Sequence, residues 1–356
     1  MSLSVSISLS LLVVVVAFYY TQTNSAMPSL AAIRASNAAF FRSKPAPSSA
    51  VAANVPTAVF VGGTSGIGEG MALTYAEHTE GKSNIIIVGR NAAAAERIFA
   101  SMPSPPADIQ PKLAREFVQC DATLMKNVHV ASQTILSRYP KINYLVMSPG
   151  YSTLVGRDET PEGIDRKLAV HYYARWKFLH DLLPGLKDAQ EKGEKAAVVS
   201  VMAAGHGGKI DLEDLGLKKG YSLSAAALAA PTYNDLMMES FAEQAPNVTF
   251  IHAFPGFVRT SLGSSSPSPT LRIVSPSCSP SLVPSPTAVK PGAWRVGSKG
   301  EDLGMKRHFG DEVQRKKVWE HTVEVMRAAL ASSSAGTSKA GSRNNNSTST
   351  LRPDIV

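Results

Sequence analysis

Short apolar runs alternate with longer, mixed stretches through the middle of the chain. Six runs rich in Val, Ile and Phe have the length of buried strands. They are Ala58–Val61, Asn84–Val88, Phe117–Cys120, Tyr144–Met147, Ala196–Val201 and Val248–Ala253. Helices are predicted over Gly68–Ala76, Ala92–Met102, Val128–Tyr139, Gly163–Leu183 and Ala225–Gln244, the last interrupted early by Pro231. Apolar strands that alternate with helices indicate a parallel sheet covered on both faces. Because parallel crossovers are right-handed, the expected fold class is α/β, a doubly wound parallel sheet in three α/β/α layers.

This alternation stops after Leu262. Residues 263–300 are rich in Ser and Pro, a composition that cannot build a core, so a flexible surface segment is predicted there. A helix returns over Asp311–Leu330, with Asp311 as its cap and apolar anchors that would pack on the domain. The polar residues 331–356 are predicted to form a disordered tail.

The first 56 residues have a different character. The uncharged stretch Val5–Tyr20 is short for a membrane span, which needs about 20 residues, and no Lys or Arg precedes it as in a signal peptide. The alternatives are a weak signal or anchor, a processed leader, or a start assigned too early, with Met27 as the true start. Residues 27–56 have the composition of a transit peptide. We expect a cytoplasmic protein, with organelle targeting or membrane anchoring through this segment as the alternatives.

The distribution of charge and the cysteine content limit which classes of partner and metal site are expected. The formal net charge is +8, but Lys and Arg are scattered and no acidic residue precedes Glu69, so no nucleic-acid partner is expected. Membrane contact is expected only if residues 5–20 are retained. The two cysteines, Cys120 and Cys278, make neither a disulfide framework nor a metal cluster. No metal site is predicted, and a reducing compartment fits.

A glycine-rich loop, Gly62-Gly63-Thr64-Ser65-Gly66-Ile67-Gly68, joins the first strand to the first helix. A pyrophosphate must approach the backbone amides at a helix N-terminus, and glycine leaves room for that approach. This strand–loop–helix context predicts a dinucleotide site rather than a merely tight turn. At the end of the second strand, where an acid would bind the ribose of NAD, stands Arg90, which can pair with a 2′-phosphate. NADP(H) is therefore the preferred cofactor and NAD(H) the alternative, unless Arg90 is only a solvated surface residue.

Together with three later segments, this loop resembles the short-chain dehydrogenase/reductase family. Cys120-Asp121-Ala122 is similar to the family's Asp position, Ser148-Pro149-Gly150 stands where the family has Asn-Ala-Gly, and Pro255-Gly256-Phe257-Val258-Arg259-Thr260 is similar to its Pro-Gly segment. The resemblance covers about Thr57 to Leu262. It implies a Rossmann fold, Asp121 near the adenine, the Pro-Gly segment beside the nicotinamide, and a homodimer or homotetramer. The expected cofactor-binding residues are Gly62, Thr64, Ser65, Gly66, Ile67, Gly68, Arg90, Asp121, Ser148, Gly150, Pro255, Gly256, Val258 and Thr260.

The catalytic motif of that family is missing. Its Tyr, which gives a proton to the substrate carbonyl, and its Lys four residues later should lie near Ala225–Ala227 and Ala229–Pro231, where neither residue occurs. The remaining candidates are Tyr221, Ser200 and His171. Ser200 shares a strand face with Met202, which stands at the usual Ser, and His171 stands at the usual Asn. Tyr173 and Lys177 have the right spacing, but they lie on the wrong helix, so we interpret that spacing as chance.

The predicted function is therefore that of an NADP(H)-dependent oxidoreductase acting on a small carbonyl or alcohol substrate. The alternative is a catalytically inactive NAD(P)-binding protein that serves as a sensor or partner. The predicted organisation is a leader at 1–56, a Rossmann NAD(P)-binding domain at 57–262, a flexible segment at 263–300, a C-terminal helical segment at 301–330 and a tail at 331–356.

Overall fold

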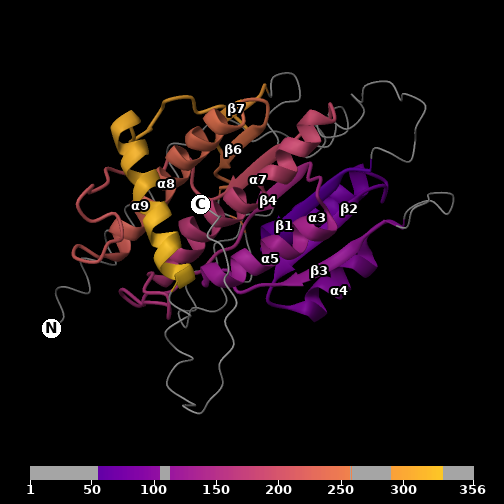
Figure 1. Cartoon of the computed structure of the whole chain (residues 1–356), viewed down its shortest axis with the longest axis horizontal. Helices are drawn as coiled ribbons and strands as arrows, with labels where there is room; N and C mark the ends of the chain where they lie inside the picture. Colours follow the sequence, from indigo (N-terminus) through magenta and orange to yellow (C-terminus); the bar gives the residue numbers. More distant parts are fainter. Residues whose placement is uncertain (1–54, 105–112, 257, 259–289, 332–356) are drawn as a thin grey trace, which may run out of the picture.

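A computed structural model describes residues 55–104, 113–256, 258 and 290–331. Seven parallel strands form one sheet in the order β3-β2-β1-β4-β5-β6-β7 (Figure 1). The strands are β1 (Thr57–Val61), β2 (Asn84–Gly89), β3 (Arg115–Gln119), β4 (Tyr144–Met147), β5 (Ala197–Val201), β6 (Thr249–Ala253) and β7 (Gly292–Val296). The order runs outward from β1 in both directions, so the predicted doubly wound Rossmann sheet is confirmed. The predictions for residues 1–54 and 332–356 lie outside the described residues.

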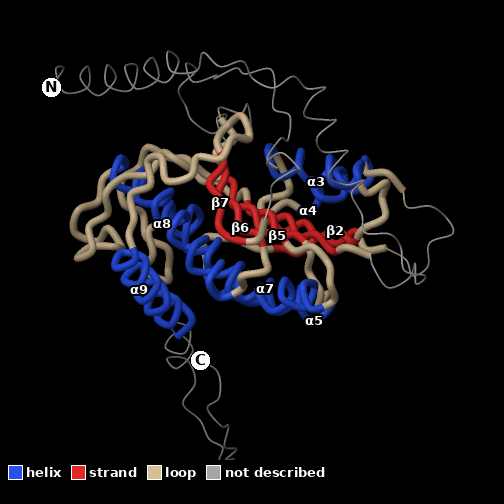
Figure 2. Tube along the Cα trace, turned by 90° about the horizontal axis from the view of Figure 1, so that it is seen from above, coloured by secondary structure: helices blue, strands red, loops and turns tan. Residues whose placement is uncertain are grey.

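Helices cover both faces of this sheet (Figure 2). One face carries α3 (Gly66–His78) and α4 (Ala92–Ser101), and the other carries α5 (Met125–Arg138), α7 (Ala174–Glu191) and α8 (Leu223–Gln244). The last helix, α9 (Glu312–Ala331), packs outside this layer against α8 and α5. None of the helices in the described ranges is both long and apolar enough to cross a membrane.

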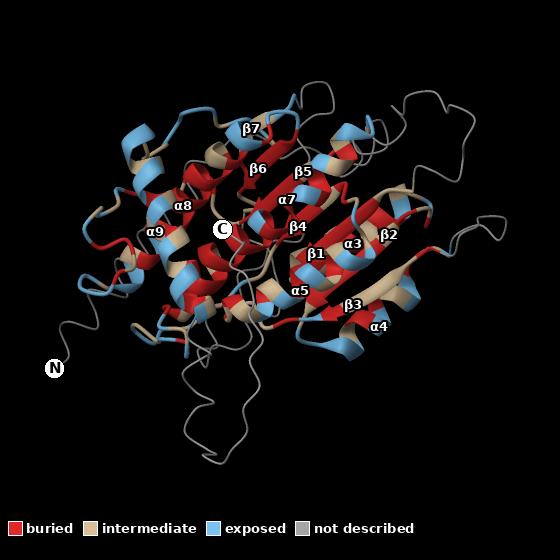
Figure 3. Cartoon of the chain, viewed as in Figure 1, coloured by how far each residue is buried: buried red, intermediate tan, exposed pale blue. Residues whose placement is uncertain are grey.

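The inner strands β1, β2 and β4 to β6 are buried along most of their length because each face of the sheet meets a helix layer, whereas the edge strands β3 and β7 are only partly buried (Figure 3). In β1, Val59 and Val61 face the α5/α7 side, whereas Ala58 and Phe60 join the cluster under α3 and α4. This alternation follows from the two-residue period of a strand. Its consequence is a rigid central sheet whose strand ends hold the loops that follow them in fixed positions.

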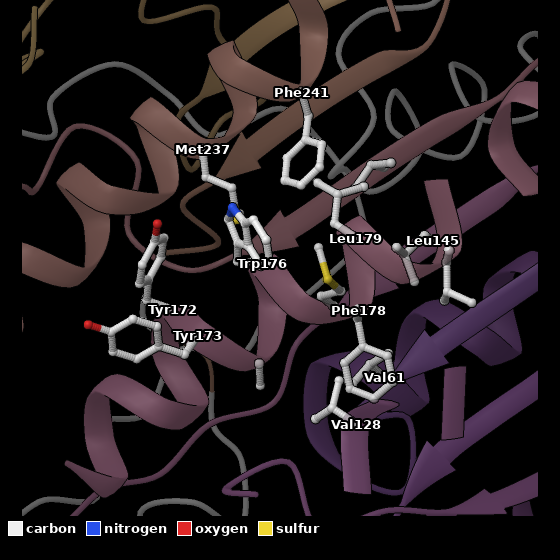
Figure 4. Close-up of a cluster of buried hydrophobic side chains, with 14 of the residues drawn as sticks. Val61, Val128, Leu145, Tyr172, Tyr173, Trp176, Phe178, Leu179, Met237 and Phe241 are labelled. Carbon is white, nitrogen blue, oxygen red and sulfur yellow. The ribbon is translucent and has the colours of Figure 1, made fainter. Parts of the chain in front are cut away.

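An aromatic cluster extends the core toward α9. Tyr172, Tyr173, Trp176 and Phe241 project into the layer between the helices (Figure 4). Trp319 of α9 lies edge-on to Trp176 at 5.1 Å and to Phe241 at 5.0 Å between ring centroids. Such edge-on pairs contribute about 0.5–1.5 kcal/mol beyond the area they bury. The C-terminal helix therefore belongs to the same core as the sheet.

Two predictions in the second half of the chain are corrected. Residues 263–300 were expected to be a flexible segment, but Gly292–Val296 forms β7 and pairs in parallel with β6. This edge strand is short and carries a buried Arg295 instead of an apolar run, so no periodicity marked it. Pro231 does not interrupt its helix, which runs unbroken over Leu223–Gln244. The Leu228 carbonyl there accepts the N–H of Gly208 at 3.1 Å, which ties this part of the helix to the loop after β5.

The long helix predicted over Gly163–Leu183 begins later and is not uniform. Asp165 caps its first turn by accepting two backbone N–H groups, each at 3.1 Å, so the helix begins at Arg166. Its first segment, α6, spans Arg166–Leu168. A π-helical turn, η1 (Ala169–Tyr173), then leads into α7. Such turns are rare and often occur at functional sites. Here the turn carries His171, which lies beside the candidate site.

Candidate functional site

A pocket of about 330 Å³ opens at the carboxyl ends of β1, β2 and β4. This is the point where the strand order reverses, and open α/β sheets bind ligands at that point. The lining comes from the loop after β1, Val88 to Arg90 at the end of β2, Cys120 to Thr123 after β3, Ser148 to Tyr151 after β4, and Val170 of η1. Of the predicted cofactor residues, the pocket brings together Gly62, Thr64, Ser65, Gly66, Ile67, Arg90, Asp121, Ser148 and Gly150.

Three glycines give the floor of this pocket its shape. Gly62 has φ +79° and Gly66 has φ +59°, a backbone region that favours glycine. A Cβ on Gly62 would lie 2.7 Å from the Pro149 nitrogen, and one on Gly68 would lie 2.4 Å from the Gly62 oxygen. Gly68 does not line the pocket, but a glycine is needed at this position because α3 packs closely against the loop there.

The N-terminus of α3 offers its amides to the pocket. Ser65 is the N-cap residue, but its side chain makes no capping hydrogen bond with the first turn of the helix. The first N–H groups of a helix have no partner within the helix and, with the helix dipole, attract anions. This helix end can therefore hold a pyrophosphate.

The side of the pocket near β2 and β3 carries the polar groups. Arg90 is exposed at the end of β2 and lines the pocket. Asp121 follows β3, and its Oδ1 accepts the N–H of Thr123 at 2.9 Å, which fixes the carboxylate. Burial, with a smaller effect of Asp121, raises the pKa of Cys120 to about 12, so this thiol stays protonated and unreactive.

The predicted Pro-Gly segment is not part of the pocket formed by the described residues. Pro255, Gly256 and Val258 follow β6, two strands away from β4, and do not line it. Phe254, the residue before them, packs instead against His206, with ring centroids 4.2 Å apart. Thr260 lies outside the described residues.

Ser200 is not available as a catalytic group, which corrects the prediction. Its side chain is fully buried in β5. Its hydroxyl accepts a hydrogen bond from Arg175 Nη1 at 2.7 Å and donates one to Asn234 Oδ1 at 2.8 Å. The spacing along the strand indicated the correct face, but the hydroxyl is used to hold the core.

His171 is close to the pocket but cannot be an acid at neutral pH. Burial, and then the charges of Arg175 and Lys167, lower its pKa to about 3. The neutral ring accepts the backbone N–H of Tyr151 at its Nε2, at 3.2 Å. His171 therefore positions the loop after β4 rather than donating a proton to a substrate.

Tyr221 does not line the pocket either. Burial and the neighbouring Asp165 carboxylate raise its pKa to about 12. The ammonium of Lys167 lies 5.7 Å from the centre of its ring. The phenol is thus committed to packing beside the start of α6, and the prediction that it is the acid is not supported by its position.

The chance pair Tyr173 and Lys177 also forms no shared site. The Tyr173 hydroxyl is 2.8 Å from His321 Nε2 on α9, whereas Lys177 Nζ pairs with Asp181 at 2.7 Å. Both side chains are buried structural groups. Their spacing is that of neighbours on a helix and reflects no catalytic arrangement.

Two residues near the pocket were not predicted from the sequence. Arg175, only 1% exposed, donates to the carbonyl oxygens of Met147 (3.0 Å) and Pro149 (2.7 Å), and burial lowers its pKa to about 9. No described carboxylate forms an ion pair with it. Tyr151 lines the pocket directly after Ser148-Pro149-Gly150. Arg175 could have been noticed because it is a charged residue within an aromatic stretch of a predicted helix. Nothing in the sequence marked Tyr151 except its position directly after Ser148-Pro149-Gly150.

Comparison with known proteins decides the family. Residues 56–269, more than half of the 356 residues, match the sequence model of the short chain dehydrogenase family. The chain belongs to the short-chain dehydrogenase family. The pocket lies within the matched residues, at the point where the strand order reverses.

Two relatives of the chain carry oxidoreductase names. An oxidoreductase of Emericella nidulans is 39% identical over 206 residues, which are 58% of this chain and 59% of the relative. Oxidoreductase andH of Emericella variicolor is 36% identical over 205 residues, 58% of each chain. The chain thus spans under two thirds of the length of these relatives. An alcohol dehydrogenase from the archaeon Thermococcus sibiricus, complexed with 5-hydroxy-NADP, is 18% identical with a TM-score of 0.45, covering 60% of this chain and 82% of that chain.

Proposed function

We propose that this protein is an NADP(H)-dependent oxidoreductase that interconverts a small carbonyl compound and its alcohol. The observation that carries the proposal is the pocket at the reversal of the strand order, in which the glycine loop and Arg90 lie together. A bound nicotinamide cofactor supplies or accepts the hydride. The amides at the start of α3 would hold its pyrophosphate, and Asp121 would lie toward the adenine.

The preference for NADP(H) over NAD(H) rests on the charge at the end of β2. An enzyme for NAD has a carboxylate there that binds the ribose 2′-hydroxyl. Here Arg90 occupies that end, with Thr64 and Ser65 on the adjoining loop, and Asp121 is the one carboxylate among the described lining residues. Asp121 follows β3, one strand further out. A guanidinium and two hydroxyl groups that line the same pocket suit a phosphate.

Cofactor titration tests this preference. We expect NADPH to raise the melting temperature more than NADH, because only NADPH carries the 2′-phosphate that pairs with Arg90. Arg90→Asp should reverse the order, since it removes the cation and adds an acceptor for the ribose hydroxyl. The measurement is thermal unfolding at equal cofactor concentrations.

The control is Arg327→Asp, which makes the same charge change at an exposed position on α9. It should leave the order of the two cofactors unchanged. Equal shifts for NADPH and NADH in the parent protein would refute the role given to Arg90. Binding of NADPH without its oxidation by any member of a panel of small ketones and aldehydes would contradict the proposed reaction and favour a role in cofactor binding alone.

A further inference from the structure

The two halves of the pocket have different chemistry. The glycine loop follows β1, Arg90 lies on the side of β2, and Ser148 to Tyr151 lie on the side of β4. With its pyrophosphate on the loop and its adenosine toward Arg90, a dinucleotide places its other half along the end of β4. Under the proposed function, the nicotinamide would therefore be held on the side of Tyr151.

Few groups on that side can give up a proton. Among the described lining residues after β4, only Ser148 and Tyr151 carry a hydroxyl. The Ser148 hydroxyl faces the Val61 carbonyl at 3.4 Å, and a Cβ on Gly68 would lie 2.5 Å from it, so this hydroxyl is enclosed between the loop and α3. The Tyr151 phenol has no hydrogen-bond partner within the described part of the chain, and a phenol is much the stronger acid of the two.

Hydrogen bonds hold the backbone around Tyr151 in place. The Tyr151 N–H donates to His171 Nε2 at 3.2 Å, and because the His171 ring stays neutral, this nitrogen remains an acceptor. Two residues earlier, the Pro149 carbonyl accepts from Arg175 at 2.7 Å, and four residues later Lys167 binds the Val155 carbonyl at 2.7 Å. A fixed backbone matters because a misplacement of about 1 Å at a reacting group can cost about a hundredfold in rate.

We propose that Tyr151 is the catalytic acid of this protein, in place of the tyrosine that the family keeps on a later helix. This inference rests on the proposed function and adds a residue to it. The carbonyl carbon of the substrate receives the hydride that the reduced cofactor supplies, and the electron pair of the C=O π bond moves onto oxygen. That oxygen takes the phenolic proton of Tyr151, and water returns a proton to the phenolate. The products are the alcohol and the oxidised cofactor.

The first test separates turnover from binding. Tyr151→Phe should lower carbonyl-dependent NADPH oxidation by about a hundredfold or more, the usual contribution of a general acid. The Kd for NADPH, measured by fluorescence titration, should stay within about twofold, because the phenol does not hold the cofactor. Tyr139→Phe, which removes a hydroxyl bound to Glu116 on the surface, is the matched control and should keep the parent rate. Full turnover by Tyr151→Phe, or the same loss in Tyr221→Phe alone, would overturn the assignment.

The second test needs no turnover. A positive charge within about 4–6 Å favours an ionised phenol, and only the oxidised nicotinamide ring carries one. Saturation with NADP⁺ should therefore lower, by about one pH unit, the pH at which one phenol of the parent protein ionises, as followed by tyrosinate absorbance. NADPH should leave that pH unchanged. Subtracting the titration of Tyr151→Phe assigns the change to Tyr151. Identical titrations with both cofactors would show that Tyr151 is not beside the nicotinamide.

The two proposals fail in different ways. If neither NADPH nor NADP⁺ raises the melting temperature, the proposed function is wrong, and the assignment of Tyr151 falls with it. If the cofactor binds and carbonyls are reduced, but Tyr151→Phe keeps the parent rate and titration, only the assignment of Tyr151 is wrong.

Discussion

Gly68→Ala is expected to lower the affinity for NADPH by about a hundredfold or more while the sheet remains folded. The new Cβ would lie 2.4 Å from the Gly62 oxygen and 2.5 Å from Ser148 Oγ, and real Cβ atoms do not approach backbone that closely. The loop must then move away from α3, and the amides that face the pyrophosphate move with it. A displacement of about 1 Å at a reacting group costs about a hundredfold in rate, and we expect a loss of similar size in binding when the amides of this loop are displaced. Isothermal titration with NADPH measures the affinity, and far-UV circular dichroism checks the fold.

The same helix supplies the control. A Cβ on Gly70, two residues later, meets no atom within 4 Å, so Gly70→Ala adds the same methyl group without a clash. It should bind NADPH as the parent does and raise the free energy of unfolding by up to about 1 kcal/mol, because alanine is the better helix former. Equal affinities for the two variants would contradict the view that the contact of α3 with the loop shapes the site.

The features predicted well from the sequence are those that depend on neighbours in the chain. A buried parallel strand is apolar along most of its length, and β1, β2 and β4 to β6 carry that mark. The glycine loop was equally visible, because the strand, the spaced glycines and the helix follow one another directly in the chain, and the φ of +79° at Gly62 favours glycine. These constraints act on single positions, so one sequence is enough to show them.

The features predicted poorly depend on what lies across the sheet. The strand period placed Ser200 on the correct face, but it could not show that Arg175 and Asn234 use its hydroxyl. Tyr221 was chosen for its nearness in sequence to the family's tyrosine, yet the chain carries it to the start of α6, beside Lys167. Tyr151 entered the site only because the sheet order brings the end of β4 beside the glycine loop.

Asp235→Asn is expected to have the largest effect on stability. Asp235 of α8 lies 2.5 Å from His252 Nδ1 of β6 and 2.9 Å from Arg295 Nε of β7, and all three side chains are buried. Arg295 also donates to the carbonyl oxygens of Gly304, Lys306 and Arg307, so the network joins the sheet edge to the segment before α9. Loss of the carboxylate leaves the charge of Arg295 buried without its partner. Removing one partner of a buried pair costs about 3–5 kcal/mol, and urea denaturation at pH 7 measures the loss.

The pH dependence of that loss follows from the pKa of Asp235. Burial acts to raise this pKa, but the charges and hydrogen bonds of His252 and Arg295 lower it by more, so it lies below its usual value. A carboxyl with a lowered folded-state pKa stabilises fully above its unfolded pKa, about 3.9, and loses that contribution as the pH falls through the folded-state value. The destabilisation by Asp235→Asn should therefore be present at about pH 5 and shrink as the pH falls below about 4.

A surface pair provides the comparison for this network. Asp188 of α7 and Lys192, the C-cap residue of that helix, are 2.6 Å apart, with the Lys192 side chain 54% exposed. Asp188→Asn should cost less than about 1 kcal/mol, because solvent already screens the pair. If Asp235→Asn cost no more than Asp188→Asn at pH 7, the buried network would not be holding β7 to the sheet. The edge strand would then owe its place to the packing of Val296 and Trp294 and to the backbone ladder with β6.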